Sequence, residues 1–193
     1  MQDVTENQQS LDSARQALAQ VEASHDPWDK SVGHALRNFA AILCSANQHL
    51  EAEPLLERAL AILDDSTFDS RLDSGRVMCE LACVYQQLNK LKKAEKLYRM
   101  SLLRLSDRVQ ILDSTALMAA HSLATLYEKR EAYDQAEGLL NTVLKIKEKS
   151  LGQDDAELSN TLLQLAGVLK LQHRIDECRQ CYDRALKVRK TAK

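Results

Sequence analysis

Cysteine and histidine are the residues of this 193-residue chain that could most readily do chemistry. Cys79 and Cys83 are one helical turn apart, and His121 follows Cys79 by 42 positions. Two thiolates and an imidazole could bind zinc, but a tetrahedral site needs a fourth ligand, and none is evident. Small buried thiols are more often packing residues in helical proteins. The pattern therefore predicts no metal site.

A second pair, Cys178 and Cys181, has the Cys-x-x-Cys spacing of thiol redox enzymes. Those motifs work at a helix N-terminus, where the thiolate is stabilised, whereas this pair lies within a predicted helix. The chain also lacks an H-E-x-x-H motif, a glycine-rich phosphate loop and a G-x-S-x-G motif. We therefore expect no catalytic residues, no cofactor and no enzymatic activity.

Four aspartates form an acidic stretch, and the sequence predicts a solvated linker over residues 64–75. They lack the glycine placement of a calcium-binding loop. These residues are Asp64, Asp65, Asp69 and Asp73.

An internal repeat with a period of 42 positions organises the elements that carry these side chains. Residues of the same kind recur at this interval without insertion or deletion. One such column is Ala52, Ala94, Ala136 and Cys178, and a second is Ala40, Ala82, Ala124 and Ala166. A fixed period over most of a chain predicts a repeat architecture, which favours a binding scaffold over an enzyme.

Each repeat contains two runs of apolar residues at helical spacing, separated by a short polar turn. In the first copy the runs begin at Leu36 and Ala52, and the turn lies at 46–48; the next copy has its turn at 88–90. This is a helical hairpin, and a hairpin can bury its apolar face only by stacking on its neighbours. The predicted fold is an all-α, right-handed α-solenoid of tandem helical hairpins.

Composition agrees with a helical protein that binds other proteins. The chain has 5 Gly and 2 Pro, and 45% of its residues are hydrophobic. Its net charge of −2 gives no field that would attract nucleic acid or an anionic membrane. We expect no membrane insertion and no secretory signal. Five cysteines, an odd number, suit reduced thiols in a cytoplasmic protein.

The columns resemble the tetratricopeptide repeat signature, with Leu81-Ala82 and Tyr85 in one helix and Ala94 and Tyr98 in the next. The period exceeds the ~34 residues usual for this family. The extra residues follow the second helix, where Leu151-Gly152 precedes an acidic turn, as in the kinesin-light-chain type of repeat. The resemblance covers residues 33–190 and implies a protein-interaction scaffold. The resemblance is weak for kinesin association, because this sequence does not contain the heptad coiled coil that joins a light chain to its motor, and whether the protein associates with kinesin stays open.

The expected organisation is one continuous solenoid. Residues 1–32 form a leading half-repeat helix and turn, followed by repeats at 33–75, 76–117, 118–159 and 160–193. The helices at 10–22 and 176–190 are expected to leave apolar side chains uncovered, which makes self-association through the ends possible. The exposed candidates are Leu11, Ala14, Leu18, Leu186 and Val188.

The resemblance implies that the first helices line a concave groove that binds a peptide segment of a partner. The stripe opposite the packing columns is predicted to form this groove. It has small residues along its middle and basic residues towards its start, which suits an acidic segment because arginine holds carboxylates through two hydrogen bonds. The predicted groove residues are His34, Arg37, Ala41, Arg76, Cys79, Cys83, Met118, His121, Thr125, Asn160, Leu163 and Gly167.

The sequence thus predicts a scaffold or adaptor that binds a protein or peptide, such as an adaptor for cargo or complex assembly. The alternative is a structural segment of a larger array whose main activity is self-association. The known peptide modes of the family do not transfer cleanly. The chaperone-type carboxylate clamp needs Lys and Asn in the stripe, and Ala41 and Glu80 stand where Asn would help.

Overall fold

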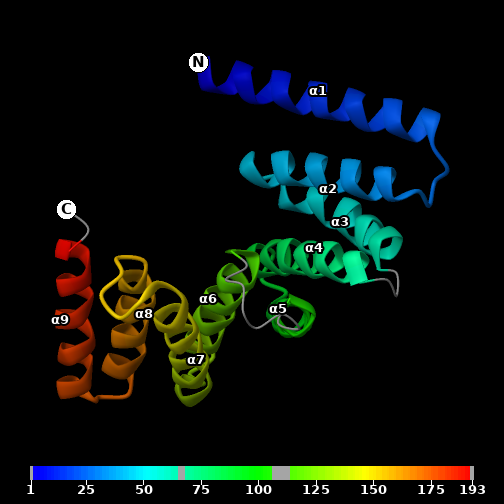
Figure 1. Ribbon diagram of the computed structural model, residues 1–193. Coiled ribbons are helices and arrows are strands. Elements are labelled where there is room, and N and C mark those ends of the chain that lie inside the picture. The colour runs from blue at the N-terminus through cyan, green and yellow to red at the C-terminus, as the bar shows by residue number, and fades with distance from the viewer. Residues whose placement is uncertain (1, 65–67, 106–113, 192–193) are drawn as a thin grey trace. The chain divides into compact units, whose positions relative to one another are not determined.

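The computed structural model describes residues 2–64, 68–105 and 114–191, with side chains for 8–64, 71–105 and 114–190. Within these ranges the secondary structure is helical, with no strand (Figure 1). The chain divides into two compact units, Met1–Leu105 and Ser106–Lys193. The all-α prediction is confirmed.

The first unit contains a leading helix and two helical hairpins, and the second contains two hairpins. The helices of the first unit are α1 (Gln2–Ser24), α2 (Lys30–Ser45), α3 (His49–Leu63), α4 (Phe68–Gln87) and α5 (Leu91–Leu105). Those of the second are α6 (Ser114–Lys129), α7 (Tyr133–Leu151), α8 (Leu158–Leu171) and α9 (Ile175–Thr191). Each even-numbered helix pairs with the odd-numbered helix that follows it, and α4 and α8 also pack on the hairpin before them.

The turn inside each hairpin has the same backbone geometry in all four copies. One residue adopts a left-handed conformation, with φ between 58° and 62°, and these residues are 42 positions apart: Asn47, Asn89, Glu131 and His173. The N–H of the next residue donates to a carbonyl five residues earlier, as Gln48 does to Leu43 at 2.8 Å and Lys90 to Tyr85 at 2.7 Å. This bond ends the first helix in a Schellman-type turn. The turns predicted at 46–48 and 88–90 are confirmed.

Alanines fill the positions where two helices come closest. Ala40, Ala82, Ala124 and Ala166 are buried in the first helices, and Ala52, Ala94 and Ala136 in the second helices. Large side chains such as Leu56, Tyr98 and Leu140 are buried beside them. The small residues set the spacing between helices and the large ones fill the space around them.

Two glycines bring helices of the first unit even closer. A Cβ added to Gly33 would lie 2.8 Å from Leu63 Cγ, and one added to Gly75 would lie 3.0 Å from Leu105 Cδ2. The two glycines are one repeat apart, as are the two leucines, so the same close contact occurs in the first and second repeats. In the second unit the equivalent residues are Leu117 and Lys147, and the Lys147 ammonium donates to the carbonyl of Glu157 at 3.0 Å.

The long second helix and its Leu-Gly end are as predicted. The helix α7 ends at Leu151, and Gly152 follows with a φ of 95°, a conformation that glycine adopts without strain. The leading helix is longer than the predicted 10–22, since α1 begins at Gln2. None of the helices in the described ranges has the length and apolar content needed to cross a membrane.

The acidic stretch is not a linker throughout, and that part of the prediction is wrong. Helix α4 begins at Phe68, so Asp69 and Asp73 are helical. Asp64 follows α3 and forms an ion pair with Arg104, which joins the two second helices. Asp65 lies outside the described residues. Asp73 has basic partners on α2 and α4, described below, which a solvated linker would not provide.

The prediction of uncovered apolar side chains at the ends is mostly wrong. Leu11 and Leu18 are buried because α1 packs against α2, and Val188 is buried because α9 packs on α8. Leu186 is 43% exposed, as predicted, and Ala14 is half-buried. The leading helix therefore covers its apolar face within the unit.

The close approach at Gly33 predicts a large cost for a single methyl group. Gly33→Ala should lower the free energy of unfolding by about 1–3 kcal/mol, because Leu63 cannot move away without disturbing the core. Gly138→Ala in α7 is the matched control. Its Cβ would meet no atom within 4 Å, so the change should raise stability by about 0.5–1 kcal/mol through helix propensity. Urea unfolding followed by circular dichroism measures both, and equal effects would contradict the close packing.

Candidate functional site

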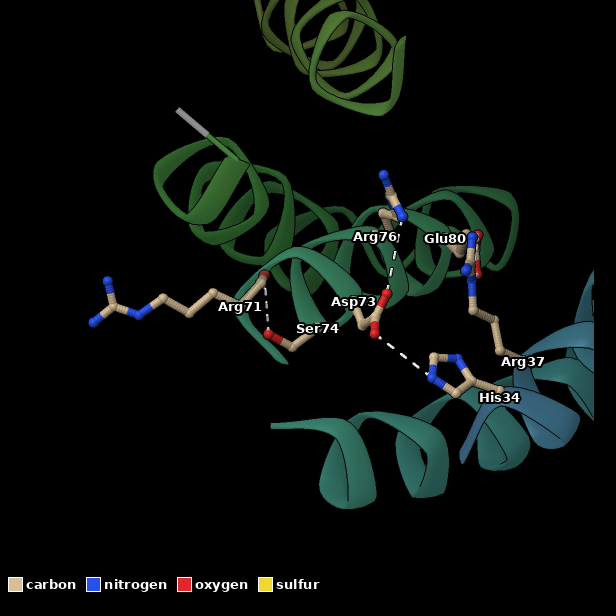
Figure 2. Close-up of polar contacts among 7 residues, drawn as sticks. All are labelled: His34, Arg37, Arg71, Asp73, Ser74, Arg76 and Glu80. Carbon is tan, nitrogen blue, oxygen red and sulfur yellow. Dashed lines mark hydrogen bonds and ion pairs between the residues drawn. The ribbon is translucent and has the colours of Figure 1, made fainter. Parts of the chain in front are cut away.

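The twelve predicted groove residues lie on the first helices α2, α4, α6 and α8, and we call this set the first-helix face. In the first unit its polar residues are held by acidic partners from the same face (Figure 2). The Arg37 guanidinium of α2 donates to Glu80 of α4, with Nε 2.9 Å from both carboxylate oxygens and Nη2 2.6 Å from Oε1. These hydrogen bonds raise the pKa of Arg37, so its guanidinium stays charged at neutral pH.

Asp73 lies between the other two basic residues of this part of the face. Its carboxylate is 3.5 Å from His34 Nε2 and 3.9 Å from Arg76 Nη1 (Figure 2). Because Glu80 and Asp73 already face Arg37 and Arg76, the charge of the two arginines is largely balanced within the protein. The basic residues could be predicted from the sequence, but the two acidic residues were not recognised there as their partners.

In the second unit the same positions carry a histidine and a glutamine in place of the ion pair. His121 of α6 and Gln164 of α8 occupy the places of Arg37 and Glu80, two repeats later. The His121 Nδ1–H donates to Gln164 Oε1 at 2.6 Å, and Gln164 Nε2 donates to the Thr125 hydroxyl at 2.9 Å. The buried Thr161 hydroxyl lies 3.3 Å from His121 Nε2. A polar bridge between adjacent first helices is therefore kept in both units, with different chemistry.

The cysteines of α4 divide between the core and the surface. Cys79 is fully buried, so its placement in a binding groove was wrong: this side chain packs inside the unit. Cys83 is half-buried, and the Tyr98 hydroxyl donates to its Sγ at 3.2 Å. Hydrogen bonds from Cys79 and Tyr98 lower the pKa of Cys83 to about 7, whereas burial raises the pKa of Cys44 and of Cys181.

Several residues of the face are open to solvent. Ala41, Met118, Asn160 and Gly167 are exposed, and Leu163 is half-buried. A Cβ at Gly167 would meet nothing within 4 Å, so the backbone of α8 is accessible at that point. Exposed apolar and small residues next to oriented amide and hydroxyl groups suit contact with a polypeptide more than with a small ion. Within the described ranges, no three His, Cys, Asp or Glu side chains are placed to hold a metal.

The lowered pKa of Cys83 predicts selective alkylation. At pH 7.5 iodoacetamide should modify Cys83 before Cys44 and Cys181, since the thiolate is the reactive form. The rate should reach half its maximum near pH 7, and Tyr98→Phe should move that midpoint to higher pH by removing a donor to sulfur. Mass spectrometry of tryptic peptides measures each site. Equal rates at the three cysteines would contradict this electrostatic account.

Comparisons with known proteins agree on one family. Residues 31–102 and 115–191 match the tetratricopeptide repeat family. No curated protein matches the sequence. Among solved structures, the repeats of a Podosopora anserina protein described as a kinesin light chain with nearly identical TPR-like repeats superpose with a TM-score of 0.83 at 19% identity. That match covers 100% of this chain and 91% of the other.

Two further structures share the fold. The apo form of RapI has a TM-score of 0.82 at 17% identity, covering 97% of this chain and 65% of RapI. YrrB, described as a TPR protein with an unusual peptide-binding site, has a TM-score of 0.60 at 13% identity, covering 97% of this chain and 80% of YrrB. The family match over most of the sequence and the regular period show that this chain belongs to the tetratricopeptide repeat family.

Proposed function

We propose that this protein is an interaction scaffold whose first-helix face binds a peptide segment of a partner protein. The repeat fold is that of protein-interaction modules, and YrrB provides a structural relative described as having a peptide-binding site. The observation that carries the proposal is the open surface of α6 and α8. Met118, Asn160 and Gly167 are exposed there beside the half-buried Thr125 and Leu163.

The surface of the second unit offers what an extended peptide needs. The accessible backbone at Gly167 permits close approach of another chain, and Met118 and Leu163 offer apolar contact. The network around His121 and Gln164 holds polar groups in fixed orientations, which supports specificity without a large loss of side-chain entropy. An adaptor role in cargo or complex assembly would follow from this binding.

The basic residues of this face alone would favour an acidic ligand, but acidic side chains of the protein already contact them. Glu80 accepts hydrogen bonds from the Nε–H and Nη2–H of Arg37, and the Asp73 carboxylate lies close to both His34 and Arg76. An acidic segment would have to displace these carboxylates, so a charged ligand is not part of the proposal for this face.

The five cysteines are free thiols, which suits a reducing compartment such as the cytoplasm.

The alternative function, self-association, is favoured by a separate observation on α9. Ile175, Tyr182 and Leu186 are 55%, 51% and 43% exposed, and Leu171 at the end of α8 is 46% exposed. The residues equivalent to Tyr182 in the earlier repeats, Leu140, Tyr98 and Leu56, are buried. Light scattering over a concentration series tests this alternative, which requires a mass that rises with concentration and falls back in Tyr182→Glu.

A peptide selection tests the proposed function. Peptides selected from a displayed random library on the wild-type protein should lose at least tenfold in affinity for Thr125→Trp, because the indole would cover the surface between α6 and α8. Thr142→Trp is the matched control, since Thr142 is an exposed residue of α7 and should tolerate the change. Fluorescence anisotropy measures both. If no peptides are selected, or if they bind Thr125→Trp as well as the control, the proposal is wrong.

A further inference from the structure

A hollow of about 350 Å³ lies between the second helices α3 and α5 of the first unit. Its floor is Met78, Leu81 and Tyr85 of α4. Each of these residues comes two positions after a residue of the first-helix face, which is about 200° around a helix. The hollow is therefore on the opposite side of α4 from the face considered above. Its apolar walls are Leu60 of α3 and Leu97 and Met100 of α5.

Arginine bridges cross the corresponding place in two other pairs of second helices. Arg58 of α3 pairs with Glu22 of α1, and Arg184 of α9 pairs with Glu148 of α7 at 2.6 Å. The two arginines are three repeats apart, as are the two glutamates. The bridge is thus a recurring feature, in which a guanidinium lies across the gap between consecutive second helices.

The pair α3 and α5 keeps the acid of this bridge but not the arginine. Asp64 occupies the glutamate position, and Met100 occupies the arginine position. Asp64 pairs instead with Arg104, one helical turn further along α5, and Arg104 also donates to the Ser74 hydroxyl at 2.6 Å. Because position 100 carries methionine, the half-buried side chains of Leu60, Leu97 and Met100 line an open apolar hollow.

The part of the rim that α5 provides is basic, whereas the equivalent positions on the second helices α3 and α9 carry no lysine. Lys93 and Lys96 are exposed and line it, and Lys93 Nζ lies 5.0 Å from the centre of the Tyr85 ring. The equivalent residues are Glu51 and Pro54 on α3, and Glu177 and Gln180 on α9. A second hollow of about 400 Å³ shares Lys96 and Met100 with the first and adds Lys92, Glu95 and Arg99 to its lining.

The acidic residues at the rim offset only part of this charge. Glu57 accepts a hydrogen bond from the Tyr85 hydroxyl at 2.6 Å, and Asp64 is paired with Arg104. Glu95 lies 3.8 Å from Arg99, which leaves three lysines along this side of α5. An apolar depression beside exposed lysines is complementary to an acidic chain that carries an aliphatic side chain.

We propose that the hollow between α3 and α5 binds an acidic segment of a partner protein. The segment places a leucine-, isoleucine- or methionine-sized side chain against Leu60, Leu97 and Met100, and its carboxylates lie along Lys92, Lys93 and Lys96. A hollow of this volume matches the lower end of typical ligand sites. The missing arginine bridge is what makes the site available. The proposal does not depend on binding at the first-helix face.

Fluorescein-labelled peptides of twelve residues provide the probe. One peptide carries a central Leu-Leu flanked by Asp and Glu, a second has the leucines replaced by Ser, and a third has the acids replaced by Lys. Only the first should bind, with an affinity that falls as NaCl is raised, because exposed charges are screened over ~8–10 Å near physiological salt. Equal binding of the Ser peptide, or no binding of the first peptide, would overturn the proposal.

Met100→Arg is the decisive variant, because it rebuilds at Asp64 the bridge that joins α1 to α3 and α7 to α9. It should weaken binding of the acidic peptide at least tenfold although it adds a positive charge. Electrostatics alone predicts tighter binding, so tighter or unchanged binding would overturn the apolar hollow as the site. Circular dichroism checks that helix content is unchanged.

Three further variants distinguish binding in this hollow from non-specific attraction and from binding at the first-helix face. Lys96→Glu should weaken the complex, whereas Lys145→Glu, at an exposed lysine of α7, should not. Thr125→Trp should also leave it intact, since that change blocks only the first-helix face. If the Lys145 variant loses as much as the Lys96 variant, the binding is non-specific attraction. A different outcome would be that the wild-type protein binds no peptide but self-associates, and that Met100→Arg abolishes the self-association. A second copy of this chain would then be the occupant, and the proposal of an acidic partner would be wrong.

Discussion

The close approach of paired helices is the constraint on which the rest of the structure depends. It requires a very small side chain at fixed places, and the alanine columns and the pair Gly33 and Gly75 supply one. Because each hairpin buries its apolar face only against a neighbour, these contacts must recur at the same interval along the chain. The left-handed residues at the hairpin turns, 42 positions apart, show that the backbone follows the same rule.

On this regular backbone, surface side chains vary from one repeat to the next, and this variation gives the protein distinct surfaces. The bridge between adjacent first helices is an ion pair between Arg37 and Glu80 in the first unit and a hydrogen bond between His121 and Gln164 in the second. Another bridge keeps its charges, since Lys90 with Glu53 is matched by Arg174 with Glu137 two repeats later. Met100 occupies the position of Arg58 and Arg184 in the first and fourth repeats, and it lines a hollow between α3 and α5.

The repeat and its packing columns could be predicted from the sequence, because small and large apolar residues at these fixed intervals are typical of stacked helical hairpins. The placement of polar side chains could not. Arg37 and Arg76 look available for a ligand in the sequence, and only the structure shows that Glu80 and Asp73 face them from α4. The burial of Cys79 could not be predicted either, because helical spacing alone does not show how much of each helix its neighbours cover. The paired spacings of 43 between Arg37 and Glu80 and between His121 and Gln164 are the signal that could have found these bridges.

The central claim, that buried small side chains hold the helices at their spacing, is tested most directly at Ala124. This alanine is fully buried in α6, within the column that recurs in every repeat. Ala124→Leu should lower the free energy of unfolding by about 1–3 kcal/mol, since the added atoms have no space between the helices. Ala19→Leu, at an exposed position of α1, should leave it nearly unchanged. An Ala124→Leu protein that unfolds at the same urea concentration as the wild type would contradict the account.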